Sequence, residues 1–553
     1  MANYNDLAEL IFKDVTLTVE DLEKRYPKRD LKEGAMVTRF APSPTGFLHT
    51  GSLFTSLVSA RYAKQSGGVF YIRLEDTDTK REIQGSGESL IRQLAVFDVI
   101  PDEGYLSDTK EIGNYGPYKQ SNRAYIYRAC IKHLMKMGRA YPCFCTQEEL
   151  AELRKVQEAN KEIPGYYGKY AKYRDFPIDE AIKKIEAGEP YIIRFKSMGD
   201  HNNKIKFHDE IRGDLELTEN DQDIVILKGD GLPTYHFAHL CDDHFMHTTH
   251  VTRGEEWLPS LPIHLELFDT MGFERPKYAH FPVIMKVENG NRRKLSKRKD
   301  VEAAVSYFLE QGYPKYGFIE YLLTIANSNY EMWRNENLDK DFYDFKLSFD
   351  KMSLDGALFD LEKVASISKE RMAYRKASDL CQEVKEWAKT YQPEFYQKII
   401  SDEAFFTSIL NIEREKDKPR KDYSKYSDIY PIISFFYDDV YNQIDLKNLD
   451  FGQFDKEDVK AVLNDYKESI DLSLDEEAWF NSMKELSMRH GFADNVKVWK
   501  KNKEAYKGHV GDVTGFLRIT LSGRSVCPNL YYIIQILGKE KTLARIDKVL
   551  NSL

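Results

Sequence analysis

The run of residues 36–74 constrains the fold more than any other part of this 553-residue chain. A short extended segment meets a turn rich in proline and glycine at residues 42–46, which must end it. Apolar residues then recur at helical spacing over residues 51–65, and the two glycines at 67–68 end that helix. Residues 69–74 are predicted to form a buried strand. Strand, turn, helix and strand in this order make a βαβ unit, which predicts a parallel sheet in an α/β fold.

The α/β pattern continues beyond the βαβ unit, with one interruption. Residues 224–228 and 281–285 are two further apolar strand candidates. Residues 115–228 carry charged helices and short strands of their own, which is typical of an insertion. The sequence therefore predicts an α/β domain at residues 37–345 with this insertion. A charged, helical N-terminal extension at residues 1–36 precedes the domain.

The remainder of the chain has a helical character. Residues 346–370 are predicted to be a connecting segment, and residues 371–553 a mostly α-helical domain. Residues 473–476 have the form of a capping box ahead of an apolar stripe. The last helix is expected around residues 531–537, where Gly538 stops it. A chain of this length is expected to divide into several domains in this way.

Composition and charge narrow the class of protein. The formal net charge is −9, so any contact with RNA must come from a local basic face. No apolar run is long enough to span a membrane. Acidic residues Asp6, Glu9 and Asp14 lie where a signal peptide would carry basic and apolar residues. Six scattered cysteines do not form a disulfide framework and fit a reducing compartment. These features predict a cytoplasmic protein.

The turn of the βαβ unit carries the first motif that is suited to ligand binding or catalysis, at residues 39–52. A helix beginning there would direct unpaired N–H groups and a positive dipole end toward a bound phosphate. His49 can donate a hydrogen bond to phosphate oxygens, and Gly51 allows an adenine or ribose close to the backbone. An isolated His-x-Gly is more often an ordinary strand-to-helix turn, so only the full run is specific.

A run of basic residues at 294–299 is the second motif. It contains Lys294, Lys297, Arg298 and Lys299, and two arginines precede it. A mobile basic loop of this kind can clamp a triphosphate and neutralise its charge during cleavage. For the segment alone, a solvated charge run is the commoner explanation.

Together the two motifs resemble the two signatures of the class I aminoacyl-tRNA synthetases, of which His-x-Gly and a lysine-rich loop are the cores. The surrounding segments are similar to the glutamyl-tRNA synthetase branch of that family, and they occur in the family's order: residues 39–46, 73–78, 231–236 and 253–257. The resemblance begins near residue 36 and reaches the C-terminus. It is looser after residue 371, where residues 517–524 match best.

The resemblance implies a role for each matching residue. The glutamate-binding residues would be Arg39, Ala41, Ser43, Glu75, Tyr235, His239 and Arg253. The ATP-binding residues would be Pro42, Ser43, Pro44, Thr45, Gly46, His49, Gly51, Ser52 and Lys297, and the catalytic residues His49, Gly51, Lys294 and Lys297. The chemistry is consistent, because arginine pairs with carboxylates in bidentate fashion and glutamate carries two of them. A glutamate side chain likewise suits the substrate ammonium.

The resemblance also implies a Rossmann-like catalytic domain, an insertion that binds the tRNA acceptor end and a helical domain that reads the anticodon. The implied partners are L-glutamate, ATP with Mg²⁺, and tRNA-Glu, and the family is usually monomeric. Two basic stretches, residues 414–425 and 497–507, are candidates for contact with RNA. Either stretch could equally be solvated surface.

Two positions depart from the family pattern. Many members have Asn at the position of His239, so the exact shape of the glutamate pocket is expected to differ. Cys143 and Cys145 resemble half of a zinc site, but Tyr170 stands where a further cysteine is expected. Two thiolates do not close a tetrahedral site, so structural zinc is not expected. The crowded His, Cys and Asp residues at 239–250 are expected to pack and hydrogen-bond rather than bind metal.

Alternative functions differ from this resemblance in particular sequence features. A glutaminyl enzyme has a different segment at residues 41–44, whereas an enzyme that charges both tRNA-Glu and tRNA-Gln remains compatible with the sequence. The tRNA-modifying paralogue lacks the helical C-terminal half. A non-catalytic relic would have lost His49 or Lys297, and both are present. A general class I nucleotidyltransferase needs no large helical domain.

Overall fold

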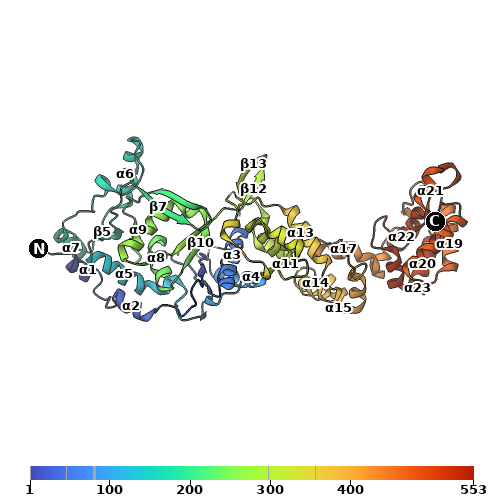
Figure 1. The fold of residues 1–553 in the computed structure, drawn as a ribbon, viewed down its shortest axis with the longest axis horizontal. Helices are drawn as coiled ribbons and strands as arrows, with labels where there is room; N and C mark the ends of the chain where they lie inside the picture. The colour runs from blue at the N-terminus through green and yellow to red at the C-terminus, as the bar shows by residue number, and fades with distance from the viewer. Residues whose placement is uncertain (1, 45, 79–82, 297, 355) are drawn as a thin grey trace. The chain divides into compact units, whose positions relative to one another are not determined.

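The computed structural model describes residues 2–44, 46–78, 83–296, 298–354 and 356–553 (Figure 1). The chain forms two compact units. The first comprises Met1–Tyr307 and Ile319–Asp360, and the second comprises Phe308–Phe318 and Leu361–Leu553. Among the described helices, none combines the length and apolar content that crossing a bilayer requires.

The predicted βαβ unit is present in the first unit. Strands β1 (Val37–Phe40) and β2 (Val69–Ile72) pair in parallel, and helix α3 (Thr50–Ser66) connects them. Gly67 ends the helix in the left-handed conformation. A Cβ on Gly68 would lie 2.0 Å from the Met36 carbonyl oxygen, so only glycine fits there. The α/β fold class is confirmed.

Further parallel strands extend this arrangement on both sides of the βαβ unit. Strand β3 (Glu103–Ser107) continues the sheet in parallel beyond β2, after helix α4 (Ser86–Val96), and β4 (Lys110–Ile112) adds an antiparallel edge. Strands β10 (His250–Gly254) and β11 (Lys277–Phe281) pair in parallel on the other side of β1, between and after helices α8 (Tyr235–Phe245) and α9 (Leu261–Met271). The carboxyl ends of β1, β2, β10 and β11 therefore meet at one edge, where ligands bind in open α/β sheets.

The expected strand over residues 281–285 is wrong. Strand β11 ends at Phe281, and the chain leaves the sheet at Pro282, which has no N–H for a strand ladder. Strand β12 (Met285–Glu288) then begins an antiparallel hairpin with β13 (Asn291–Lys294). The first residue of the second motif, Lys294, therefore lies on a strand, so the motif is not entirely a loop.

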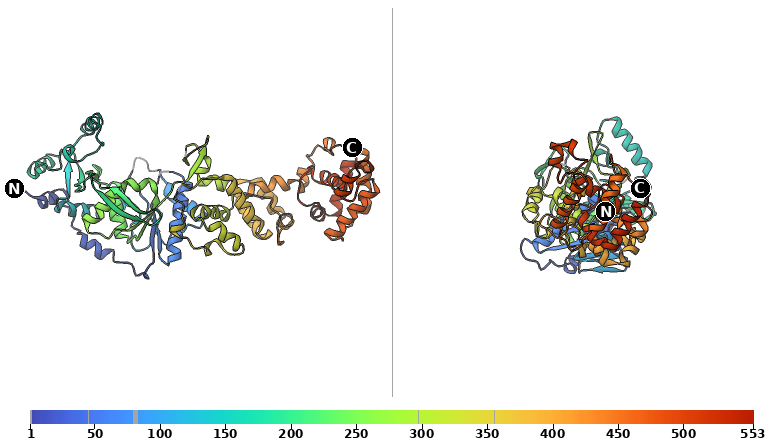
Figure 2. Two further views of the ribbon diagram at one scale, coloured as in Figure 1. Left: turned by 45° about the horizontal axis from the view of Figure 1, so that its top comes forward. Right: turned by 90° about the vertical axis from the view of Figure 1, so that its right-hand side faces the viewer.

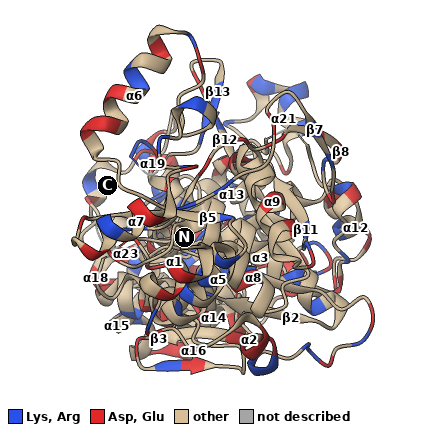
Figure 3. Ribbon diagram, turned by 90° about the vertical axis from the view of Figure 1, so that its left-hand side faces the viewer, with Lys and Arg blue, Asp and Glu red and all other residues tan. Residues whose placement is uncertain are grey.

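The segment over residues 115–228 divides between two sheets. Strands β5 (Ala140–Cys143), β6 (Ile192–Phe195) and β9 (Val225–Leu227) form a separate antiparallel sheet, accompanied by helices α6 (Gln147–Ala159) and α7 (Ile178–Glu186). The hairpin of β7 (Lys204–Asp209) and β8 (Gly213–Thr218) joins β11 instead (Figures 1 and 2). Helix α6 stands out from the unit and alternates in charge along its length, as expected of a solvated helix (Figure 3).

The N-terminal extension packs into the first unit. Helices α1 (Tyr4–Ile11) and α2 (Val19–Arg25) lie against α5 (Ala124–Lys136) and contribute buried side chains to its core. Lys132 of α5 donates to the Glu9 carboxylate at 2.8 Å and to two backbone carbonyls between the two N-terminal helices. The extension is therefore an integral part of this unit.

Leu22 tests this packing. Its side chain is fully buried against α5, so Leu22→Ala is expected to lower the free energy of unfolding by about 2–4 kcal/mol. Lys24→Ala is the matched control, because 80% of the Lys24 side chain is exposed two residues away. Urea unfolding followed by circular dichroism compares the two variants. Equal transitions for both would contradict an integral role for the extension.

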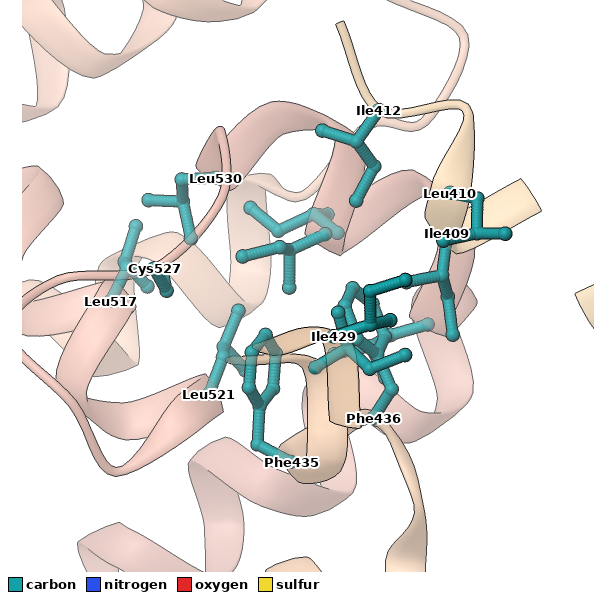
Figure 4. Close-up of a cluster of buried hydrophobic side chains, with 14 of the residues drawn as sticks. Ile409, Leu410, Ile412, Ile429, Phe435, Phe436, Leu517, Leu521, Cys527 and Leu530 are labelled. Atoms are coloured by element: carbon teal, nitrogen blue, oxygen red, sulfur yellow. The ribbon is translucent and has the colours of Figure 1, made fainter. Parts of the chain in front are cut away.

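The second unit is helical, as the sequence predicts. No strand occurs among its described residues. Its helices after residue 360 are α13 (Leu361–Ala373), α14 (Ala377–Tyr391), α15 (Pro393–Ser401), α16 (Glu403–Leu410), α17 (Ile429–Ile433), α18 (Asp438–Tyr441), α19 (Lys456–Ser469), α20 (Glu476–Arg489), α21 (Val496–Lys501), α22 (Val510–Ser522) and α23 (Leu530–Leu550). Side chains from α16, α17 and α22, including Ile409, Ile429 and Leu521, converge in its core (Figure 4).

Two predicted helix ends in the second unit differ in detail. The N-cap of α20 is Asp475, whose carboxylate accepts from the Ala478 N–H, whereas Ser473 hydrogen-bonds to Asp471. Gly538 does interrupt the last helix with φ of 74°, but helical structure resumes and continues to Leu550. Glycine therefore introduces a break at the predicted position without ending the element.

Candidate functional site

A cavity of about 1040 Å³ opens at the carboxyl ends of the parallel strands in the first unit. Many of the residues predicted to form a site line it: Arg39, Ala41, Ser43, His49, Gly51, Ser52, Glu75, Tyr235, Arg253 and Lys294. Pro42, Pro44, Gly46 and His239 are not among the lining residues. Thr45 and Lys297 lie outside the described residues. The structure thus gathers both motifs and the predicted glutamate-binding residues around one space.

His49 and the start of α3 form one wall of the cavity. His49 is the N-cap of the helix, and its Nδ1 accepts a hydrogen bond from the Gly51 N–H at 2.9 Å. A Cβ on Gly51 would lie 3.1 Å from that same nitrogen, so glycine also makes room for the capping ring. Because Gly51 and Ser52 line the cavity, the positive end of the helix dipole faces it.

Two buried arginines near the cavity, Arg39 and Arg73, pair with carboxylates. Arg39 donates through Nε to Asp243 at 3.2 Å, and Arg73 donates through Nη1 to the same carboxylate at 2.7 Å. Arg73 also pairs with Glu75, at 2.9 Å. Burial alone would raise the pKa of Asp243, but the two arginines hold it well below its usual value. Asp243 therefore stays ionised and fixes both arginines.

Arg253 is held differently. Its Nε donates to His280 Nε2 at 3.0 Å, and its Nη1 lies 3.2 Å from His264 Nδ1. Among the described residues, no carboxylate forms an ion pair with it, and Nη2 has no hydrogen-bond partner. Only 5% of Arg253 is exposed, yet it lines the cavity. A buried cation without a counter-ion is costly, so this guanidinium marks a site for an anionic ligand.

The second motif reaches the cavity through the β12–β13 hairpin. Lys294 ends β13, lines the cavity and donates to the Glu256 carboxylate at 3.0 Å. Arg293 turns to the other side, where it pairs with Glu288 and Asp300. Both side chains therefore pair with carboxylates, and Lys294 is the one that lines the cavity.

His239 does not lie where the sequence predicts. It is fully buried one helical turn beyond Tyr235 on α8, and the two rings stack at 5.9 Å with an angle of 10°. Its Nε2 lies 3.0 Å from the Tyr278 hydroxyl, and its Nδ1 lies 2.6 Å from Asp243. His239 therefore supports the wall that Tyr235 presents to the cavity instead of forming that wall itself.

Burial also lowers the pKa of His239 to about 4. Below pH 6.5 the unfolded chain takes up a proton on this ring that the folded chain does not, so the free energy of unfolding falls as the pH falls toward 4. We expect His239→Asn to reduce the slope of unfolding free energy against pH by about 1 kcal/mol per pH unit, because each proton bound only by the unfolded chain contributes about that much to the slope. Urea midpoints at pH 6.5, 5.5 and 4.5 measure the difference. Identical slopes would contradict a neutral buried ring.

Sequence reasoning missed several residues of the site. Trp257 lines the cavity with its ring 4.3 Å from that of Tyr235. Lys228 also lines it and donates to the Thr77 carbonyl at 2.8 Å. Arg73 lies in one of the segments that carry the family resemblance, and Asp243 in an Asp-Asp pair on α8, but nothing local shows that they meet. Their contact joins residues 170 positions apart.

The two cysteines of the half zinc site face a tyrosine. Cys143 Sγ lies 3.5 Å and Cys145 Sγ 3.6 Å from the hydroxyl of Tyr166. Tyr170, which stands where a further cysteine would be expected, hydrogen-bonds to Glu162. No cluster of three or more metal-ligating side chains is found over the described ranges. The donor set here therefore does not fit a closed tetrahedral zinc site.

The two basic stretches of the second unit differ in character. In residues 414–425, Arg414 is buried and donates to backbone carbonyls, and Arg420 and Lys421 pair with acidic residues. Around α21, by contrast, lysines are exposed beside the half-buried ring of Trp499, and none has an ion-pair partner among the described residues: Lys497, Lys500, Lys501 and Lys503. Exposed cations next to an aromatic ring are typical of a surface that binds single-stranded nucleic acid.

Two family models and several full-length relatives match this chain. A family model described as class I tRNA synthetases (E and Q), catalytic domain, matches residues 35–352, and one described as anticodon binding domain matches residues 379–550. The glutamate–tRNA ligase of Clostridium perfringens is 49% identical over 549 residues, which cover 99% of this chain and 100% of that protein. The glutamate–tRNA ligase of Clostridium beijerinckii is 48% identical over 551 residues, with 99% and 100% covered.

A solved structure matches over nearly the whole chain as well. The crystal structure of a glutamate tRNA ligase from Elizabethkingia meningosepticum, in complex with its amino acid, superposes with a TM-score of 0.73 at 29% identity. The match covers 94% of this chain and 99% of that one. The two catalytic motifs, the helical second unit and these full-length matches agree, and the chain belongs to the glutamate–tRNA ligase family of the class I aminoacyl-tRNA synthetases.

Proposed function

We propose that this enzyme activates L-glutamate with MgATP and transfers the glutamyl group to the 3′-terminal adenosine of tRNA-Glu. AMP and diphosphate are the other products. The single observation that carries the proposal is the buried guanidinium of Arg253, which has no carboxylate partner among the described residues and faces the same cavity as the positive end of α3. One group suits a carboxylate and the other a phosphate, so the cavity can hold both substrates of an acid-activating reaction.

In the first step a carboxylate oxygen of glutamate attacks the α-phosphorus of ATP. The bond to the bridging oxygen breaks, and diphosphate leaves. The N-terminus of α3, His49 and Lys294 supply positive charge and hydrogen-bond donors to the phosphates, and we assign Lys297 to the same role by family resemblance. Catalysis is then mainly positioning and electrostatic stabilisation. Mg²⁺ enters with ATP as part of that substrate.

In the amino-acid subsite, we assign the substrate carboxylates to Arg253 and Arg39. Glu75 suits the substrate ammonium, and Tyr235, Ala41 and Ser43 complete the walls, with His239 acting behind Tyr235. In the second step a ribose hydroxyl of the terminal adenosine attacks the carbonyl carbon of glutamyl adenylate. The mixed anhydride bond breaks, and AMP leaves.

For tRNA, we propose that the segment at residues 115–228 grips the acceptor end and that the helical domain at residues 371–553 reads the anticodon. The catalytic domain would then extend over residues 37–345 and the connection over residues 346–370. The exposed lysines around α21 support contact with RNA in the helical domain. A cytoplasmic monomer is expected from the family, and sedimentation of the purified enzyme tests the monomeric state.

The proposal is tested by aminoacylation with labelled glutamate and glutamine on purified tRNA-Glu and tRNA-Gln. Glutamate is expected on tRNA-Glu. Glutamate on both tRNAs would identify an enzyme that does not discriminate between them and would direct attention to the anticodon-binding surface. Failure of folded enzyme to charge either tRNA with either amino acid in the presence of MgATP would refute the proposed reaction.

The surface around α21 yields a separate prediction. Replacing Lys500 and Lys501 by glutamate is expected to raise the KM for tRNA about tenfold and to weaken its dependence on salt, because phosphate contacts release counterions. Lys418→Glu, an exposed lysine of the other basic stretch, is the matched control. Aminoacylation at several salt concentrations gives both quantities, and the KM for glutamate serves as an internal reference. Equal effects of the two charge reversals would contradict the assignment.

A further inference from the structure

Two histidines behind the cavity are arranged around Arg253 as hydrogen-bond acceptors. His280 accepts the Arg253 Nε–H through Nε2 at 3.0 Å, and His264 Nδ1 faces Nη1 at 3.2 Å. Arginine can only donate, so each of these ring nitrogens must carry a lone pair. Both rings are therefore neutral, and the proton of each lies on its far nitrogen.

The far nitrogens have matching acceptors. His280 Nδ1 lies 2.6 Å from the buried Asp209 carboxylate, which therefore accepts its proton. His264 Nε2 lies 3.0 Å from His236 Nδ1, so the proton can be shared with a third ring. Burial lowers the pKa of both His264 and His280, and the charge of Arg253 acts in the same direction. Tautomer and charge state are thus set by the surrounding structure.

We propose that His264 and His280 are positioning residues for amino-acid binding, which hold Arg253 through uncharged acceptors and so leave its charge and its Nη2 for a substrate carboxylate. This inference rests on the proposed function. Each acceptor fixes one nitrogen of the planar guanidinium, and two fixed nitrogens define the direction of the third. A carboxylate in either place would fix the geometry equally well but would neutralise the charge before the substrate arrived.

The other arginines of the same site show the contrast. Arg39 and Arg73 share the ionised Asp243, so part of the charge of each is compensated before a substrate binds. Arg253 instead lies over the ring of Tyr278, with its guanidinium carbon 4.9 Å from the ring centre. An aromatic face stabilises a cation without cancelling its charge. Among the described residues, neutral acceptors and the rings of Tyr278 and Trp257 therefore hold Arg253.

Three substitutions at His264 separate geometry from charge. The Oδ1 atom of asparagine takes the place of Nδ1, so His264→Asn keeps a neutral acceptor and is expected to change the KM for glutamate by less than about threefold. His264→Asp places a carboxylate at the same point and is expected to raise that KM at least tenfold. His264→Leu removes the acceptor and is expected to do the same. In all three, we expect the KM for ATP and the kcat at saturating glutamate to change less than about twofold.

A general structural defect would not produce this pattern, because it would lower kcat or affect both substrates, and asparagine would not rescue it. Equal KM values for glutamate in His264→Asn and His264→Asp would overturn the inference. Circular dichroism checks that each variant folds. If His264→Asp does not fold, the pair His280→Gln and His280→Glu makes the same comparison at the other acceptor, because glutamine Oε1 replaces Nε2.

Measurements on the wild-type enzyme distinguish the proposed function from the proposed positioning role. If it charges glutamate and the variants differ as stated, both the function and the positioning role hold. If it charges glutamate and the asparagine and aspartate variants do not differ, only the positioning role is refuted. If the wild type does not use glutamate at all, the proposed function fails, and the positioning role is refuted with it.

Discussion

Arg253→Met is expected to lower kcat/KM for glutamate by about 10²–10³-fold. The variant loses a charge-assisted contact with a substrate carboxylate inside a desolvated cavity, and truncating one partner of such a pair costs about 2–5 kcal/mol. The KM for ATP should change little, because we assign Arg253, at the end of β10, to the amino-acid subsite and not to the phosphates. Aminoacylation at varied glutamate and at varied ATP measures both quantities.

The same variant should not be less stable than the wild type. In the absence of substrate, Arg253 is a buried cation with no counter-ion among the described residues, and such a charge destabilises the folded state. Methionine fills a similar length without that cost. We therefore expect the urea midpoint to be unchanged or higher, combined with the loss of activity. A large decrease in stability would show that Arg253 mainly supports the fold, and an unchanged kcat/KM would refute its role in binding.

Asp243→Asn, in contrast, is expected to lower the stability of the protein. Removing this charge leaves Arg39 and Arg73 buried without their shared counter-ion, and breaking a buried ion pair in this way costs about 3–5 kcal/mol. The side chain keeps its shape, so the loss arises from charge rather than packing. Urea unfolding of the variant measures it against Asp214→Asn, whose side chain is 95% exposed on β8. Loss of less than 1 kcal/mol would mean that the arginines find other partners.

Much of the fold could be predicted because its signals are local. The turn at residues 42–46 and the glycines at 67–68 delimit α3 to within one residue of each end. The strand expected over residues 281–285 fails because apolar character alone does not distinguish a strand from a buried segment in which Pro282 interrupts the hydrogen bonds. At α20, the capping-box form of residues 473–476 points to Ser473 as the N-cap, whereas the helix begins two residues later, with Asp475 as its N-cap.

Site residues that lie in contiguous motifs could be predicted from the sequence. The prediction was incomplete where side chains from distant parts of the chain meet. The network of Arg39, Arg73 and Asp243 depends on the packing of α8 against β1 and β2, for which no local pattern exists. The contact of His239 with Tyr235 could have been anticipated. It follows Tyr235 by four residues on one helix, and residues at that spacing share a face. A cavity-facing tyrosine therefore implies a histidine beside it along the same stripe.

The hydrogen bond that begins helix α3 also selects a tautomer. Because His49 Nδ1 accepts the Gly51 N–H, the proton of the neutral ring must reside on Nε2. In many enzymes an acidic side chain makes this choice for a histidine, but here a backbone amide makes it. Protonation of Nδ1 would break the N-cap hydrogen bond. The first turn of the helix and the choice of donor and acceptor nitrogen on the ring therefore depend on the same bond. A disturbance that frays this turn would release the ring to its other tautomer as well.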